Sequence, residues 1–144
     1  MVQGIDSLLK KHRENAGQRE AVKPVFEGVD GYDVYNPTAP FMYEERKLIC
    51  ARVEPRDSEV SETVFFEETE KDVYVPAKEL PRFSLQDPCI TMGEGQYILG
   101  GTEVFPHPEN PEWVAWRTAF FCGEKLTALR PLVKGPIGMK DVRL

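Results

Sequence analysis

The feature that most constrains this sequence is a series of short runs rich in Val, Ile, Phe, Tyr and Thr, separated by Gly, Pro, Asn and Asp. Such runs predict β-strands. Four of them follow one another without a helical pattern between them and with turn signals such as Gly93-Glu94-Gly95 and Gly123-Glu124, near 88–93, 96–104, 114–122 and 125–132. Consecutive strands joined by short turns form an antiparallel meander. A meander also occurs in sandwiches and barrels, so the pattern alone predicts an all-β fold without choosing among these architectures.

A less regular set of strands is predicted before this meander, near 24–28, 46–54, 62–68 and 72–76. At the N-terminus, residues 5–16 have apolar side chains at helical spacing, with Asp6 or Ser7 as the expected cap and Gly17 as the expected stop. We therefore expect an N-terminal helical segment over 1–20 and one β-domain over 21–144. No short sequence repeat is visible.

Composition excludes several classes of function. Lys and Arg total 18 against 24 Asp and Glu, a net charge of -6 that argues against a nucleic-acid surface. No apolar run is long enough to span a bilayer, and the N-terminus lacks the apolar core of a secretory signal. The three cysteines are far apart, so we expect buried free thiols, no metal site and a reducing cytoplasm.

Asp87 stands at the boundary between a loop and an apolar strand, directly before Pro88. Proline biases the preceding residue toward an extended backbone, which suits a preorganised catalytic acid. The same Asp-Pro pair is also a common turn former.

Arg52 and Arg56 flank Glu54 at the end of another apolar run. Guanidinium groups bind phosphate or a carboxylate in a bidentate manner, so this segment is a candidate binding site for a phosphate or for sugar hydroxyls. The alternative is a set of surface ion pairs of little energetic value.

Two further segments carry polar groups where a strand would prefer apolar ones. Asn36 lies in Tyr35-Asn36-Pro37-Thr38, which is either a turn or part of a site. Lys140, Asp141 and Arg143 alternate in charge at strand spacing near the C-terminal end.

Trp113, Trp116, Phe120 and Phe121 either pack in the core or form a stacking platform for sugar rings.

Taken in order, these segments resemble a known family. Asn-Pro-x-Ala from Asn36, then Arg-Val-Glu-Pro-Arg-Asp-Ser-Glu from Arg52, then Gln-Asp-Pro at Asp87, are similar to the former domain of unknown function 1861, now placed in glycosyltransferase family 108. Later stretches that resemble it are Tyr97 to Gly101, Trp116-Arg117-Thr118 and Lys134 to Arg143. The resemblance covers nearly everything after about residue 30.

The resemblance implies a five-bladed β-propeller, related to the β-mannoside phosphorylases of glycoside hydrolase family 130, that transfers β-1,2-linked mannose or exchanges it with phosphate. It implies that Asp87 is the catalytic acid. Asn36 would line the sugar site, Arg52 and Arg56 would bind the donor sugar or a phosphate, and Glu54 would lie among them. It further implies substrate contacts from Lys140, Asp141 and Arg143, with mannose oligosaccharide, mannose 1-phosphate or phosphate as ligands and no cofactor.

Members of that family are about twice as long as this chain, so we expect a truncated propeller: about two blades, with 139–144 as the start of a third. Open strand edges would favour self-association. The alternatives to an enzyme of this kind are a non-catalytic carbohydrate-binding fragment and a hydrolase of the same architecture. A hydrolase would need a second carboxylate, for which Glu54 and Asp141 are the candidates.

Overall fold

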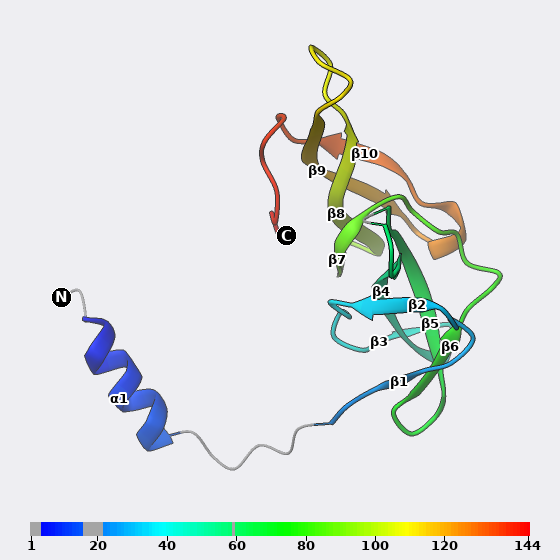
Figure 1. Cartoon of the computed structure of the whole chain (residues 1–144). Coiled ribbons are helices and arrows are strands. Elements are labelled where there is room, and N and C mark those ends of the chain that lie inside the picture. Colours follow the sequence, from blue (N-terminus) through cyan, green and yellow to red (C-terminus); the bar gives the residue numbers. More distant parts are fainter. Residues whose placement is uncertain (1–3, 16–21, 59) are drawn as a thin grey trace.

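A computed structural model describes residues 4–15, 22–58 and 60–144. These residues form one N-terminal helix and two antiparallel-dominated β-sheets (Figure 1). The predicted dominance of strands is confirmed. No helix in the described part of the chain is long and apolar enough to cross a membrane.

The helix α1 (Ile5–Asn15) buries none of its residues and lies apart from both sheets in Figure 1. Its first turn begins at the Gly4 carbonyl, which accepts hydrogen bonds from the amides of Ser7 and Leu8. Asp6 and Ser7 are therefore inside the first turn, and the prediction that one of them caps the helix is wrong. The predicted stop at Gly17 lies outside the described residues.

The first sheet has the strand order β1-β6-β5-β4-β2, and β3 also pairs with β4. Its strands are β1 (Val25–Phe26), β2 (Tyr32–Tyr35), β3 (Phe41–Tyr43), β4 (Arg46–Pro55), β5 (Glu62–Glu70) and β6 (Val73–Pro76). All pairs are antiparallel except β1 with β6. Strand β4 is the longest of this sheet and carries β2 and β3 on the same edge, one at each end.

The second sheet is the predicted meander, with the order β10-β9-β8-β7. Its strands are β7 (Gln86–Gly93), β8 (Gln96–Pro106), β9 (Val114–Gly123) and β10 (Arg130–Lys134). The β7–β8 turn has positive φ at Glu94 (51°) and Gly95 (77°), the requirement of a type I′ hairpin. The predicted strand over 125–132 is partly wrong, because a 3-10 turn at Leu126–Ala128 precedes β10.

The main core lies between the two sheets. There, Leu48, Cys50 and Phe65 of the first sheet pack with Leu85, directly before β7, and with Leu99 of β8. Side-chain alternation along β4 sends Ile49, Ala51 and Val53 to the opposite face, where a smaller core includes Phe66 and Phe26. Residues 26–34 thus cover one face of the first sheet, and the second sheet covers the other.

Strands β2 and β3 were not predicted. Strand β3 is joined to β4 by the turn Glu44-Glu45, whose residues have φ of 46° and 68°. Glutamate rarely adopts a positive φ. No Gly or Asn marks this turn, so the sequence carries no hairpin signal there. Residues 139–144 form no strand, and the strand expected to open a third blade is therefore absent from this segment.

The cysteines differ from one another. Cys50 is fully buried, whereas Cys89 and Cys122 are only half-buried, and all three thiols are free. Burial raises the pKa of Cys50 to about 12. The expectation of three buried thiols is right only for Cys50.

Candidate functional site

Asp87 lies in a β-bulge at the start of β7. Gln86 pairs with Thr102 and Cys89 pairs with Gly100, so Asp87 and Pro88 together oppose Gly101. A bulge of this kind re-aims the extra side chain and leaves its backbone unpaired, and Pro88 is tolerated because β7 is an edge strand. Asp87 has a φ of 50°, so the extended backbone predicted from the following proline is wrong. Asp and Asn are the residues, after Gly, that adopt this left-handed conformation most readily.

Two adjacent glycines on β8 lie where an added Cβ would overlap neighbouring atoms. A Cβ on Gly101 would stand 2.9 Å from the backbone oxygen of Gln86 and 3.0 Å from the Leu85 Cβ. A Cβ on Gly100 would stand 2.8 Å from the Cys89 sulfur and 2.7 Å from the Phe120 Cδ1. Gly101 therefore lets the backbone before Asp87 approach β8 closely, whereas Gly100 makes room for the Phe120 ring and the Cys89 sulfur.

Two residues of the first sheet converge on the Asp87 carboxylate. Asn36 Nδ2 donates to Oδ1 at 2.6 Å, and Arg52 Nη1 lies 3.5 Å from the same oxygen. Asn36 directly follows β2 and precedes Pro37, and its φ is 46°. Thr38 fixes this segment to β4, because its amide donates to the Cys50 carbonyl at 2.8 Å and its hydroxyl accepts from the Cys50 amide. The two sheets thus meet at this carboxylate.

Arg52 connects Asp87 to a second carboxylate. It donates from Nε to Glu54 Oε2 at 2.9 Å, and its Nη2 contacts the same oxygen. The side chains of Arg52, Glu54 and Asp87 are 17%, 13% and 24% exposed, so this ion-pair group is largely sheltered from solvent. The Arg52 guanidinium also lies over the ring of Tyr35, 5.8 Å from its centroid, and Tyr35 pairs with Arg52 across β2 and β4.

Arg56 is separate from this group. Its Nε lies 3.3 Å from Asp33 Oδ1, and its side chain is 70% exposed. The charge of Asp33 raises the pKa of Tyr35, and the hydrogen bond from the Tyr35 hydroxyl to Asp33 adds to the effect. Of the two predicted arginines, the structure brings Arg52 to Asp87 and places Arg56 in a surface ion pair.

The C-terminal segment returns to Asp87. Residues 135–139 continue along β9, where the Thr118 amide donates to the Met139 carbonyl at 2.8 Å. Arg143 Nη1 then donates to the Asp87 carbonyl oxygen at 3.1 Å. Asp141, between them, has a φ of 62° and is exposed, and no contact between Asp141 and the Asp87 carboxylate is recorded among the described residues.

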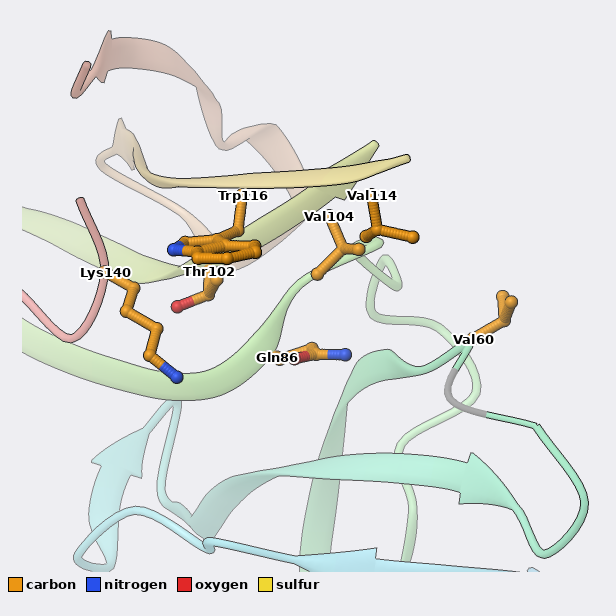
Figure 2. Close-up of a pocket in the computed structure, with 7 residues that line it drawn as sticks. All are labelled: Val60, Gln86, Thr102, Val104, Val114, Trp116 and Lys140. Carbon is orange, nitrogen blue, oxygen red and sulfur yellow. The ribbon is translucent and has the colours of Figure 1, made fainter. Parts of the chain in front are cut away.

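Lys140 lines a cavity of about 400 Å³ to which none of Asn36, Arg52, Glu54, Asp87 and Arg143 contributes. The other lining residues are Val60, Gln86, Thr102, Val104, Val114 and Trp116, and Figure 2 shows the indole of Trp116 lying over Thr102. Trp113 and Trp116 are 64% and 41% exposed, so core packing is wrong for these two residues. Phe120 is buried and Phe121 packs against the main core, as the core interpretation predicted.

Three Asx residues of this region share a left-handed backbone. Asn36, Asp87 and Asp141 all have positive φ, and they are spaced 51 and 54 residues apart. The first two are each followed by proline at the edge of their sheet. Asx-Pro at this spacing was the available signal. Gln86 was part of the Gln-Asp-Pro motif, whereas Thr102 carried no signal because it reads as an ordinary strand residue.

The described residues contain no group of three or more His, Cys, Asp or Glu side chains arranged to hold a metal ion. The Asp87 cluster itself consists of two carboxylates, one amide and two guanidinium groups. Such a set can exchange a proton with a bound hydroxyl and can bind an anion.

Most of the sequence matches a known protein family. The sequence profile described as "Protein of unknown function (DUF1861)" matches residues 10–144. No match was found among curated proteins.

Three solved structures are similar to the chain. MPT-1, a GDP-Man-dependent mannosyltransferase from Leishmania mexicana, is 30% identical with a TM-score of 0.81, over 97% of this chain and 44% of that one. MPT-4, a mannose phosphorylase from Leishmania mexicana in complex with phosphate ion, is 33% identical with a TM-score of 0.80, over 96% and 43%. A hypothetical protein from Leishmania major is 35% identical with a TM-score of 0.77, over 95% and 44%. The chain therefore spans less than half the length of these structures.

Proposed function

The chain belongs to the DUF1861 family, and from this premise we propose that it carries the mannosyl-binding half of a site that exchanges mannose between a mannoside and phosphate. Mannose is the proposed sugar because one similar structure is a mannosyltransferase and another is a mannose phosphorylase. Because the chain covers only 43% of the phosphorylase, the activity of the whole protein is part of the proposal.

The observation that carries the proposal is the convergence of Asn36 and Arg52 on one oxygen of Asp87. These side chains come from two sheets and are held by a bulge and by two left-handed residues. Backbone conformations of this kind are retained where the surrounding structure needs them, most often at functional sites. A surface ion pair would not need a glycine at position 101 behind the bulge.

In the proposed reaction, phosphate attacks the anomeric carbon of a β-mannoside and the glycosidic oxygen leaves with a proton. Asp87, in its protonated form, supplies that proton, either directly or through a hydroxyl of the sugar. Arg52 and Arg143 offer guanidinium groups to the phosphate, whose negative charge makes a base carboxylate unnecessary. Asn36 keeps the acid in position through its 2.6 Å hydrogen bond.

The two sheets are proposed to be two blades of a propeller. Each has its Asx-Pro residue at an edge facing the other sheet, and β7 lies against β4. A site at the propeller axis would then receive one Asx residue from each blade.

The test is a phosphate-dependent assay. Wild-type chain is incubated with mannose 1-phosphate and a short mannose acceptor, and in reverse with β-1,2-mannobiose and phosphate. Asp87→Asn keeps the shape and tolerates positive φ, and we expect at least a hundredfold loss of rate, about the contribution of a general acid. Asp72→Asn is the matched control, because Asp72 also has positive φ (64°) and lies in the β5–β6 turn, away from the cluster. Equal activity of wild type and Asp87→Asn would contradict the role of Asp87.

The same assay separates the rival functions. Turnover of GDP-mannose without phosphate would favour a transferase of the MPT-1 kind. Release of free mannose without phosphate would favour a hydrolase, for which Glu54 is the neighbouring carboxylate through Arg52. Binding of mannobiose without any turnover would favour a non-catalytic binding protein. A cytoplasmic location stays a prediction.

A further inference from the structure

The Arg52 guanidinium is attached to its neighbours at one point. It donates from Nε and Nη2 to Glu54, and both contacts go to the same oxygen, Oε2. A guanidinium that meets a carboxylate through two oxygens is fixed by that pair, whereas one held at a single oxygen can still pivot about it. The Nη1 atom, which lies 3.5 Å from Asp87 Oδ1, would move with such a pivot. A further contact is therefore needed to keep Nη1 at Asp87.

Tyr35 makes a contact of this kind. The Arg52 Cζ atom lies 5.8 Å from the centroid of the Tyr35 ring. This is within the distance of about 6 Å at which an aromatic face attracts a cation. The two residues are direct partners in the antiparallel pairing of β2 and β4. Partners of this kind point to the same face of a sheet, with their Cβ atoms about 4.5–5.5 Å apart, so the strand register itself brings the ring to the guanidinium.

Tyr35 is in turn held in place by its own hydroxyl. The hydroxyl donates to Asp33 Oδ2 at 3.2 Å, and Arg56 Nε lies 3.3 Å from Asp33 Oδ1. Asp33 stands directly opposite Glu54 in the same strand pair, and like charges in this position repel each other. The ion pair of Arg56 with Asp33 and that of Arg52 with Glu54 offset this repulsion. The ring therefore lies between two ion pairs on one face of β2 and β4.

Core packing does not account for Tyr35. Its side chain is 42% exposed, and it belongs to neither hydrophobic core of the described residues. The paired valines Val34 and Val53 turn to the other face of the sheet and join the smaller core there. Tyr35 also directly precedes Asn36, which donates to Asp87 Oδ1 at 2.6 Å. Two successive residues of the chain thus act on the groups that converge on Asp87.

The ring face of Tyr35, and not its hydroxyl, is the part that touches Arg52. The hydroxyl is engaged with Asp33, whose negative charge raises the pKa of Tyr35 above its usual value. The hydroxyl therefore keeps its proton at neutral pH and is not a proton donor for the proposed reaction. A phenylalanine ring at this position would present the same face to the guanidinium.

We propose that Tyr35 is a positioning residue, whose ring holds the Arg52 guanidinium so that Nη1 points at Asp87. The affinity of the site for phosphate then depends on this ring, and that consequence rests on the proposed function. The competing role for Tyr35 is direct contact with a ligand, which would not need Arg52.

The first test needs no ligand. NMR relaxation of the Arg52 Nε–H group, assigned by its loss in Arg52→Gln, measures how rigid the guanidinium is. We expect an order parameter of about 0.85 in wild type and in Tyr35→Phe, and a fall toward about 0.6 in Tyr35→Leu, which keeps apolar bulk but has no aromatic face. Tyr32→Leu is the matched control, because Tyr32 lies in the same strand, is 49% exposed and is paired with Pro55. It should leave the order parameter of Arg52 unchanged.

The second test is calorimetric titration with inorganic phosphate. Tyr35→Leu should weaken the affinity about two- to fivefold, the range of one exposed cation–π contact, and Tyr35→Phe should restore it. In an Arg52→Gln background, Tyr35→Leu should cause no further loss, because a residue that acts through Arg52 has nothing left to position. A merely structural role would instead lower the melting temperature and weaken binding equally in both backgrounds.

Two outcomes would overturn the positioning role. One is an Arg52 order parameter in Tyr35→Leu that equals the wild-type value. The other is an equal loss of phosphate affinity in Tyr35→Leu with and without Arg52, which would identify Tyr35 as a direct ligand contact. A wild-type chain that binds no phosphate would contradict the proposed function, whereas a gain of Arg52 motion confined to Tyr35→Leu would still support the positioning role.

Discussion

Gly101→Ala tests whether the bulge at Asp87 is built for the site. The new Cβ would stand 2.9 Å from the Gln86 oxygen, whereas an ordinary close C···O contact is about 3.3–3.6 Å. The backbone before Asp87 must therefore move away by about 0.4–0.7 Å. Overpacking of this kind costs about 1–3 kcal/mol, and the loss of glycine flexibility in the unfolded chain offsets about 0.4–1 kcal/mol of it. A net destabilisation of about 0–2.6 kcal/mol follows, with a midpoint of about 1.3 kcal/mol.

The same backbone displacement is large compared with the distance by which the Asn36–Asp87 hydrogen bond, now 2.6 Å long, can lengthen. Misplacement of a catalytic group by about 1 Å costs about a hundredfold in rate. We expect Gly101→Ala to fold, to melt a few degrees lower and to lose at least tenfold in the phosphate-dependent assay at a temperature where it is fully folded.

Gly93→Ala is the control, because a Cβ there meets nothing within 4 Å and its φ is not left-handed. It should keep its rate and its melting temperature. A Gly101→Ala variant with wild-type activity would refute the claim that β8 positions Asp87.

Three further predictions follow from the structure. Gly100→Ala should destabilise the chain by about 1–3 kcal/mol, measured by urea unfolding, because its Cβ would overlap the Phe120 ring. The Cys50 thiol, with a pKa raised to about 12 by burial, should react with a thiol reagent at pH 8 only as fast as the chain unfolds, and faster reaction in the native state would contradict its burial. Burial raises the pKa of Glu103, but hydrogen bonds from Lys134 and Arg117 outweigh it and hold that pKa below its usual value. The carboxylate therefore stabilises the fold above the usual glutamate pKa of about 4.3 and loses this effect as pH falls through the lower folded value. Glu103→Gln should cost under about 1 kcal/mol at pH 7, and the cost should shrink as the pH is lowered below the usual glutamate pKa.

Much of the fold was predictable because strand alternation and turn chemistry are local. The β7–β8 hairpin had Glu94-Gly95 at its turn, and the predicted strand limits there were close to those observed. The β3–β4 hairpin was not predictable, because Glu44-Glu45 adopts the same backbone without a residue that favours it. In that turn the pairing of β3 with β4 overrides local preference.

The candidate site divides in a similar way. That Asp87 and Asn36 meet follows from the pairing of two sheets, which no local pattern encodes, and it was anticipated only through the family resemblance. The difference between Arg52 and Arg56 was not anticipated. Alternation puts both on the same face of the chain, but β4 ends at Pro55, and Arg56 pairs with Asp33.

The two arginines also provide the most direct test of the central claim, that the Asp87 cluster binds the phosphate of the proposed reaction. The measurement is calorimetric titration of inorganic phosphate into wild type, Arg52→Gln and Arg56→Gln. Loss of a charge-assisted hydrogen bond of about 1.5–3 kcal/mol predicts roughly a 10- to 150-fold weaker affinity for Arg52→Gln and wild-type affinity for Arg56→Gln. Equal affinities in all three proteins, or a loss confined to Arg56→Gln, would contradict it.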